Sequence, residues 1–458
     1  MTLIAFLLLI VGATVGYVLN RRAARAIRER GARLHSLTGF HGGYAALVVL
    51  VPSFTLLLLW LALQGTVIKA LVTAGLPTEF YAALDEGPRQ LVWSEIESIA
   101  GGRIFGTPED WKIAAAERLV TMRASAGWLM IAVFAALVVG LVLFARRRVS
   151  ADFRARQGAE GIVHGLMVAC ATAAIFVTIG IIASLMFETY RFFGMVPVFD
   201  FLFGLTWEPQ IPIRADQIAA EGAFGMVPVL LGTVVISVIA MLIATPIGLF
   251  SAIYLNEFAS SRVRAVAKPV LEVLAGVPTV VYGFFAVLVI APAIRDFLGS
   301  FGLTVAPNIS LAAGFVMGIM LIPFISSFAD DALTAVPRSL RDGSLALGAT
   351  RGETMMKVLF PAAIPGIVGG VLLAVSRAIG ETMIVVMAAG LIANLTINPL
   401  DSVTTMTVQI VTLLIGDTAF DSPKTLAAFA LGMVLFVSTL VINVFALRIV
   451  RKYREIYD

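Results

Sequence analysis

Long apolar stretches recur along the chain, nearly free of Asp, Glu, Lys and Arg, and short polar segments separate them. A membrane-spanning α-helix needs about 20 consecutive apolar residues to cross the hydrocarbon core of a bilayer. The pattern therefore predicts an all-α polytopic membrane protein with nine spanning helices. The predicted spans cover about 2–19, 43–66, 126–145, 161–187, 226–254, 270–293, 309–328, 362–390 and 426–447.

Basic residues gather in alternate segments between these spans, and the intervening segments carry more acid. Cytoplasmic loops of membrane proteins are enriched in Lys and Arg. We therefore expect the N-terminus outside and the C-terminus inside, as an odd number of spans requires. The basic groups are Arg21–Arg33, Arg146–Arg156, Arg262–Lys268, Arg338–Lys357 and Arg448–Arg454.

The chain divides into two predicted parts at the basic, polar stretch Arg146–Glu160. Residues 1–160 hold three spans and an outside segment at about 67–125 that has helical character. Residues 161–458 hold six spans, and both ends of this part are expected inside.

Composition agrees with a membrane protein, since 59% of the 458 residues are hydrophobic and 14% are charged. Soluble globular chains have about 45–50% apolar and about 25% charged residues. The net charge of +4 is small, and the arginines lie at the ends of apolar stretches, so nothing favours a nucleic-acid partner. Cys170 is the single cysteine, which excludes an intramolecular disulfide, and the three histidines lack metal-ligand spacing, so no metal site is predicted.

The longest inside loop of the second part covers about 329–361 and predicts a short helix that stops near Gly348. A glycine often follows the last turn of a helix, because it adopts the left-handed conformation without strain. A short helix with an exposed apolar face suits docking into a groove of another protein. Periodicity alone also allows a helix that lies on the lipid surface.

The same loop resembles the "EAA" loop of ABC-importer permeases: an acid, two small residues, a glycine, and an apolar segment ending in proline. This chain departs from that pattern with Asp342 in place of Glu and Gly343-Ser344 in place of Ala-Ala. The resemblance implies a coupling helix that sits in a cleft of a separate ATP-binding subunit. The residues carried over are Asp342, Gly343, Ser344, Leu347, Gly348, Ala349 and Pro361.

Three further stretches narrow the resemblance to the PstC-type permeases of phosphate ABC transporters. They read "FGMVPVLLGTVVISVIAMLIATPIGLFSAIYLNEFA" (224–259), "LEVLAGVPTVVYGFF" (271–285) and "SRAIGETMIVV" (376–386). The resemblance covers roughly residues 161–458, a permease core of six helices that includes a type-1 ABC transmembrane domain at about 230–447. It implies a multi-pass protein of the bacterial inner membrane that imports inorganic phosphate by alternating access. The implied partners are a homologous PstA-type permease, a PstB-type ATP-binding dimer and an external PstS-type phosphate-binding protein.

The dipeptide Gly-Lys does not occur in the sequence, so the chain has no phosphate-binding P-loop. ATP must therefore be hydrolysed by the partner chain, and no cofactor is expected in this one. No His/Ser/Asp or metal constellation lies at matching membrane depth, so we predict a transport subunit with no catalytic residues.

Arg377 and Glu381 interrupt the eighth predicted span. A charge at the bilayer centre costs at least about 2.5–3.5 kcal/mol, so such residues usually pair or line a substrate path. Their spacing of four would place them on one helix face. Two interpretations are possible. The residues could form a structural ion pair, or they could line a path in which Arg377 binds phosphate oxygens and Glu381 accepts a hydrogen bond from protonated phosphate. Glu272, near the inner end of the sixth predicted span, is a weaker path residue and is equally consistent with a loop-facing acid.

Two alternative functions remain on sequence grounds. The substrate could be another oxyanion, such as molybdate or sulfate. Alternatively, the chain could be a membrane component that mainly signals phosphate status, because its long outside segment at 67–125 offers a surface that a partner could recognise.

Overall fold

The computed structural model describes residues 1–77, 81, 86–103, 108–209, 222–415 and 421–453. Within these residues, nine helices are long and apolar enough to cross a membrane, which confirms the predicted number of spans. The only strands in this part of the chain are two-residue segments, β1 (Trp207–Glu208) and β2 (Ala223–Phe224), which pair antiparallel. The chain forms two compact units, Met1–Val177 and Thr178–Asp458.

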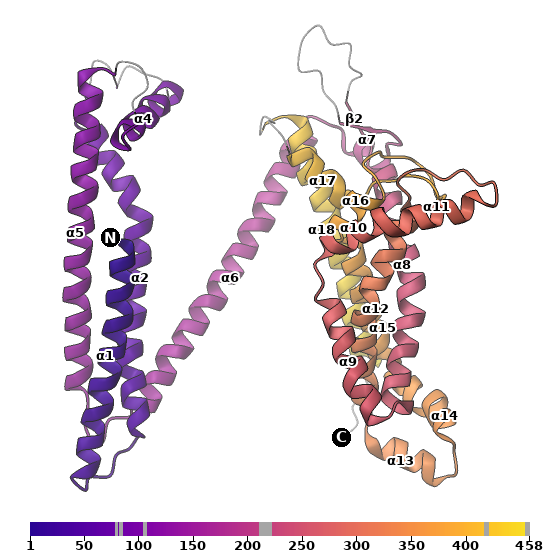
Figure 1. Cartoon of the computed structure of the whole chain (residues 1–458), viewed down its shortest axis with the longest axis horizontal. Helices are drawn as coiled ribbons and strands as arrows, with labels where there is room; N and C mark the ends of the chain where they lie inside the picture. Colours follow the sequence, from indigo (N-terminus) through magenta and orange to yellow (C-terminus); the bar gives the residue numbers. More distant parts are fainter. Residues whose placement is uncertain (78–80, 82–85, 104–107, 210–221, 416–420, 454–458) are drawn as a thin grey trace. The chain divides into compact units, whose positions relative to one another are not determined.

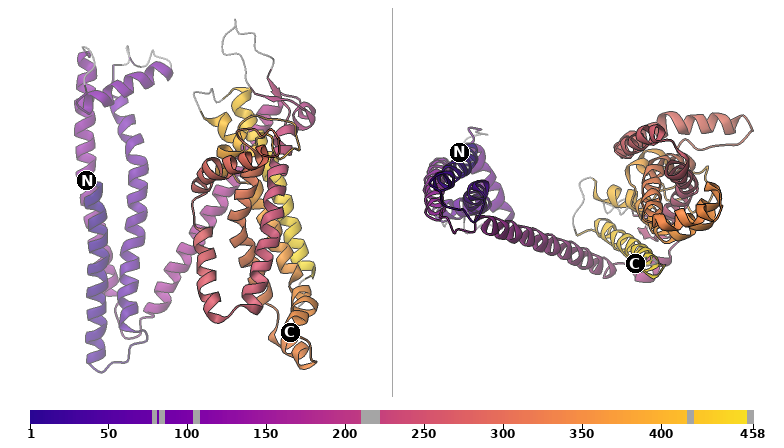
Figure 2. Two further views of the ribbon diagram at one scale, coloured as in Figure 1. Left: turned by 45° about the vertical axis from the view of Figure 1, so that its right-hand side comes forward. Right: turned by 90° about the horizontal axis from the view of Figure 1, so that it is seen from below.

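The N-terminal unit is built on three long helices that lie side by side in Figures 1 and 2, α1 (Thr2–Glu29), α2 (Thr38–Thr73) and α5 (Asp110–Arg147). The helices approach closely where small residues face large ones, as at Gly12 against Val138. Small residues are a usual means of tight helix packing in membranes, where hydrophobic burial supplies little driving force. The unit also receives the first part of α6 (Ala155–Phe193).

The predicted outside segment at 67–125 includes the end of α2, which continues to Thr73, and the start of α5, which begins at Asp110. Between them, α4 (Glu86–Ala100) packs against α5 around Ile96 and Leu119. The ion pair Lys112–Glu95, with Nζ and Oε2 2.9 Å apart, joins the same two helices.

The core of the C-terminal unit lies between α8 (Val227–Ile253), α12 (Ser310–Thr334) and α15 (Phe360–Ile379) (Figures 1 and 2). α8 continues as a π-helical turn, η1 (Tyr254–Phe258), and α18 (Pro423–Tyr453) packs on α15. α8 and α12 meet through glycines: a Cβ added to Gly314 would lie 2.7 Å from the Ile239 Cβ. These two backbones therefore pack as closely as their side chains allow.

The sixth span was predicted at 270–293, but its helices cover Thr279–Gly299. They are α10 (Thr279–Phe285), the π-helical turn η2 (Ala286–Ile290) and α11 (Ala291–Gly299). The preceding residues form a separate amphipathic helix, α9 (Ser261–Ala275), which ends before Gly276 and Pro278. Proline disfavours the helical conformation of the residue before it, which accounts for the break. Glu272 therefore lies on α9 and not within the span.

The eighth span was predicted as one helix over 362–390, but it covers Arg351–Ile379. Helix α15 ends at Ile379, Gly380 follows it, and a short helix, α16 (Met383–Ala388), begins three residues later. At the same end of the unit, α17 (Met406–Leu414) and α7 (Val198–Phe203) surround the β1–β2 pair, where the Trp207 indole donates to Gln409 Oε1 at 2.9 Å.

The glycine contact between α8 and α12 predicts a stability difference between two alanine substitutions. Gly314→Ala forces the helices apart and should lower the free energy of unfolding by about 1–3 kcal/mol. Gly180→Ala on α6 is the matched control, because nothing lies within 4 Å of its added Cβ. That change should be neutral or stabilise by up to about 1 kcal/mol through helix propensity. Fluorescence-detected size exclusion after a heating series measures both, and equal thermal stability of the two variants would contradict the packing argument.

Candidate functional site

Arg377 lies in the last turn of α15 with its side chain exposed, whereas its neighbours Ala374 and Ala378 are buried. Its guanidinium lies over the ring of Phe324 on α12, 5.7 Å from the ring centre. Within the described residues no carboxylate lies within 4.0 Å of it. Because the aromatic ring covers only one face of the planar group, its N–H edges stay available to a ligand.

Glu381 does not share a helix face with Arg377, contrary to what their spacing predicted. The helix ends between them at Gly380, and the Glu381 carboxylate turns to the start of α16. Its Oε1 accepts hydrogen bonds from the backbone N–H of Met383 at 3.0 Å and of Ile384 at 3.4 Å. Free N–H groups at a helix start attract a carboxylate, which explains why this pairing replaces the ion pair. The structure therefore does not contain the Arg377–Glu381 ion pair, which was one of the two interpretations that the sequence left open.

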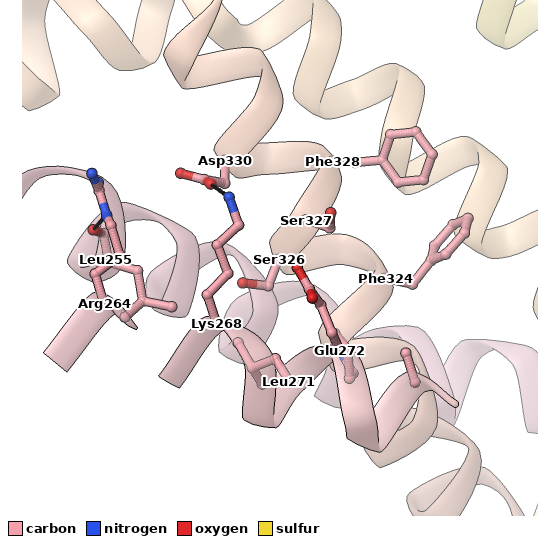
Figure 3. Close-up of a pocket in the computed structure, with 12 residues that line it drawn as sticks. Leu255, Arg264, Lys268, Leu271, Glu272, Phe324, Ser326, Ser327, Phe328 and Asp330 are labelled. Atoms are coloured by element: carbon pink, nitrogen blue, oxygen red, sulfur yellow. Dashed lines mark hydrogen bonds and ion pairs between the residues drawn. The ribbon is translucent and has the colours of Figure 1, made fainter. Parts of the chain in front are cut away.

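A cavity of about 270 Å³ lies between α9 and α12 and is lined by Glu272 and Phe324 among others. In Figure 3, Lys268 reaches Asp330 on one side of this cavity, and Glu272 comes from the following turn of α9. The Lys268 Nζ lies 2.7 Å from Asp330 Oδ2. This hydrogen bond raises the pKa of Lys268 above its usual value, so the ammonium stays charged at neutral pH. Phe324 is common to the cavity and to the Arg377 contact, so the two sites adjoin across this ring.

The loop predicted to dock an ATP-binding subunit contains the short helix α13 (Arg338–Ala346), which ends as the sequence indicated. Leu347 follows it with 92% of its surface exposed, and Gly348 adopts a φ of +89°, a conformation that favours glycine. The chain then forms α14 (Arg351–Thr354) and the π-helical turn η3 (Met355–Leu359). The other carried-over residues are Asp342, Gly343 and Ser344 on α13, Ala349 after it, and Pro361 in the first turn of α15.

One polar contact joins this loop to the end of α8 and another joins two parts of the loop, and neither was predicted from the sequence. Arg341 Nη2 lies 2.7 Å from Oε1 of Glu257 on η1, and the Ser344 and Thr354 hydroxyls are 3.0 Å apart. The signal for the Arg341 contact was Glu257 itself, an acid three residues after the fifth predicted span. Its partner lies 84 residues away, so no local pattern could identify it.

Each of the two units contains a match to a known protein family. Residues 5–177 match a family described as "Phosphate ATP-binding cassette transporter". Residues 244–455 match the family "Binding-protein-dependent transport system inner membrane component". A chain of the MetNI methionine ABC transporter aligns over 50% of this chain and 95% of that chain, with 19% identity and a TM-score of 0.38. That score lies below the level that establishes a shared fold.

The chain aligns with several curated relatives over most of their length. The probable ABC transporter permease YqgH of Bacillus subtilis is 34% identical over 60% of this chain and 86% of the relative. The probable phosphate transport system permease PstC of Methanocaldococcus jannaschii is 30% identical over 58% of this chain and 87% of the relative. PstC of Xylella fastidiosa Temecula1 is 32% identical over 55% of this chain and 80% of the relative. The chain therefore belongs to the ABC-importer permease family, in its PstC-type branch, and is a multi-pass membrane subunit of such a transporter.

Proposed function

We propose that this chain is the permease subunit of an ATP-driven importer of inorganic phosphate, with Arg377 as its phosphate contact. The carrying observation is the exposed guanidinium at the end of α15, which lies on Phe324 with no carboxylate within 4.0 Å in the described part of the chain. The planar fork of arginine matches two phosphate oxygens at once, which replaces part of the hydration that the anion loses. The names of the PstC relatives support phosphate as the anion.

A single arginine suits a transport path better than a storage site. Binding in a path must be strong enough to admit the ion and weak enough to release it. A homologous permease of the PstA type would supply the opposite wall of the path, because Arg377 is exposed when this chain is taken by itself. Glu272 belongs to the path in this proposal only as a secondary residue, because it lines the cavity that adjoins Arg377 across Phe324.

The ATP-binding subunits of a PstB-type dimer would dock on α13 and Leu347, and they would hydrolyse the ATP. An external PstS-type protein would deliver phosphate from the other side. This proposal places the complex in the inner membrane of a bacterium, with the N-terminus outside. It treats residues 1–160 as an N-terminal extension and residues 161–458 as the permease part, with no cofactor bound by this chain.

Glu381 has a positioning role in this proposal. Its carboxylate caps α16 and thereby fixes the turn that presents Arg377. The Thr407 hydroxyl donates to the Glu381 carbonyl oxygen at 2.8 Å, which ties the same turn to α17. The alternative is a direct role, in which Glu381 accepts a hydrogen bond from protonated phosphate. Such a contact would disfavour a fully deprotonated anion such as sulfate.

Arg377→Gln should lower uptake of radiolabelled phosphate by about a hundredfold, because the anion loses its charged partner at a desolvated site. Arg295→Gln on α11 is the matched control and should leave uptake unchanged. The complex should still assemble, as measured by co-purification of the ATP-binding subunit. Excess unlabelled phosphate should compete, and sulfate and molybdate should not. Native uptake by Arg377→Gln would contradict the role of Arg377, and competition by sulfate or molybdate would favour another oxyanion.

Two substitutions of Glu381 separate its roles. Glu381→Gln keeps an oxygen that can accept from the α16 backbone, so uptake should stay near the native rate. Glu381→Ala removes the cap and should destabilise the turn by about 1 kcal/mol. Uptake of labelled phosphate and of labelled sulfate is measured for each variant. A Glu381→Gln variant that loses its preference for phosphate would show that the carboxylate accepts a hydrogen bond from the protonated anion.

Leu347→Asp should weaken capture of the ATP-binding subunit by about tenfold, because a charge replaces the most exposed apolar side chain of the α13 segment. Leu303→Asp is the control, since this exposed leucine precedes α12 and lies at its other end from α13. Co-purification at graded salt concentrations measures the difference. Equal capture by both variants would place the docking surface elsewhere.

A further inference from the structure

The inner end of α8 carries a buried carboxylate that the proposed phosphate path does not use. Glu257 lies in the π-helical turn η1, and only 1% of its side chain is exposed. Its Oε1 accepts from Arg341, whereas its Oε2 has no hydrogen-bond partner among the residues described. Arg341 is therefore the charge that compensates this carboxylate, and removal of either side chain leaves the other without its counterpart.

The two residues belong to segments that are far apart in the chain. Arg341 lies on α13, directly before Asp342 of the docking loop, and 38% of its side chain is exposed. Exposed ion pairs contribute little, because water screens them and their side chains lose freedom. Burial of Glu257 sets this pair apart from the surface pair Lys357–Glu353, whose atoms are 3.6 Å apart and whose side chains are 75% and 49% exposed.

The π-turn that holds Glu257 is itself anchored to two other helices. Arg264 on α9 donates to the backbone oxygens of Leu255 and Asn256, at 2.7 and 2.5 Å. The Asn256 amide donates to Asp330 Oδ1 at 2.8 Å on α12. Glu257 is therefore held on a rigid base, and a force on Arg341 acts on α8 and its neighbours together. Single π-turns within α-helices occur often at functional sites.

The helix that receives this force reaches the proposed phosphate contact. α8 packs directly on α12 and on α15, which carry Phe324 and Arg377. By contrast, α13 connects to the helices along the chain through Ala335–Pro337 and through a turn at Gly348. The Ser344–Thr354 contact joins α13 only to α14 of the same loop, so the Glu257–Arg341 pair is the polar contact through which a displacement of α13 reaches the end of α8 directly.

We propose that Glu257 and Arg341 are positioning residues that make α13 and α8 move as one body, so that ATP-driven displacement of the docking loop reaches Arg377. This inference rests on the proposed function and names the attachment that couples hydrolysis to transport. Loss of the Glu257 carboxylate leaves both the docking surface and the phosphate contact in place but removes the ion pair that joins α13 to the end of α8. The expected defect is hydrolysis without transport.

The test uses the complete transporter in proteoliposomes and measures radiolabelled phosphate moved per ATP hydrolysed. Glu257→Gln, which leaves the α13 surface unchanged, should lower this ratio by about tenfold while ATP hydrolysis continues, and Arg341→Gln should lower the ratio as far. The double variant should be no worse than either single variant, because both remove one interaction. Arg341→Lys keeps a cation within reach of Glu257 and should retain most of the ratio. Lys357→Gln, which removes the exposed pair in the same loop, is the control and should behave as native.

A distance measurement makes the test independent of the transported ion. Spin labels are placed at Ser339 on α13 and Leu242 on α8, both exposed, after Cys170 is replaced by serine. The distance between the labels should stay narrow through the ATP cycle in the otherwise native protein, and it should broaden in Arg341→Gln. An unchanged distribution, an unchanged ratio in both single variants, or a parallel fall of hydrolysis and transport would overturn the inference. If the native complex hydrolyses ATP but moves no phosphate, the proposed substrate fails, and the distance measurement still decides the role of the pair.

Discussion

The close contact between α8 and α12 is the constraint on which the rest of the C-terminal unit depends. At Gly314 and Gly318 the backbones approach so closely that an added Cβ would clash with the Ile239 Cβ at 2.7 Å or lie only 3.0 Å from the Ala240 carbonyl oxygen. The contact therefore fixes the positions of side chains on both helices relative to one another. α12 presents Phe324 beneath Arg377 and leads directly into α13, while α8 ends in the π-turn with Glu257.

Charged groups in this unit are held in three different ways. Glu257 and Asp330 meet cations from other helices, and Glu381 meets backbone N–H groups. Arg377 rests on an aromatic ring and keeps its N–H edges free. A buried charge normally needs a strong partner, because the lost hydration is not otherwise replaced. The contrast separates charges that are paired within the fold from Arg377, which the proposal assigns to the anion.

Much of this arrangement could be predicted from the sequence, and the successes share a physical basis. Nine apolar stretches and the short helix that stops near Gly348 depend on local patterns that reach over a few turns. The failures occurred where a local pattern competes with a break or a distant partner. Gly276 with Pro278, and Gly380, end helices inside apolar stretches that hydropathy treats as continuous. Glu257 and Arg341 are far apart in sequence, and only the packing of α8 against α12 brings such segments together.

The end of α15 at Gly380 also shapes the electrostatic field around Arg377. The last carbonyl groups of a helix have no intrahelical partners. They carry the partial negative charge that the helix dipole places at the C-terminal end. Arg377 lies among them, in the last turn, so its positive potential toward an incoming anion is partly offset by the backbone around it. In the proposed phosphate path, a helix that continued past Gly380 would leave this potential undiminished, so the break weakens the attraction of Arg377 for the anion and eases its release.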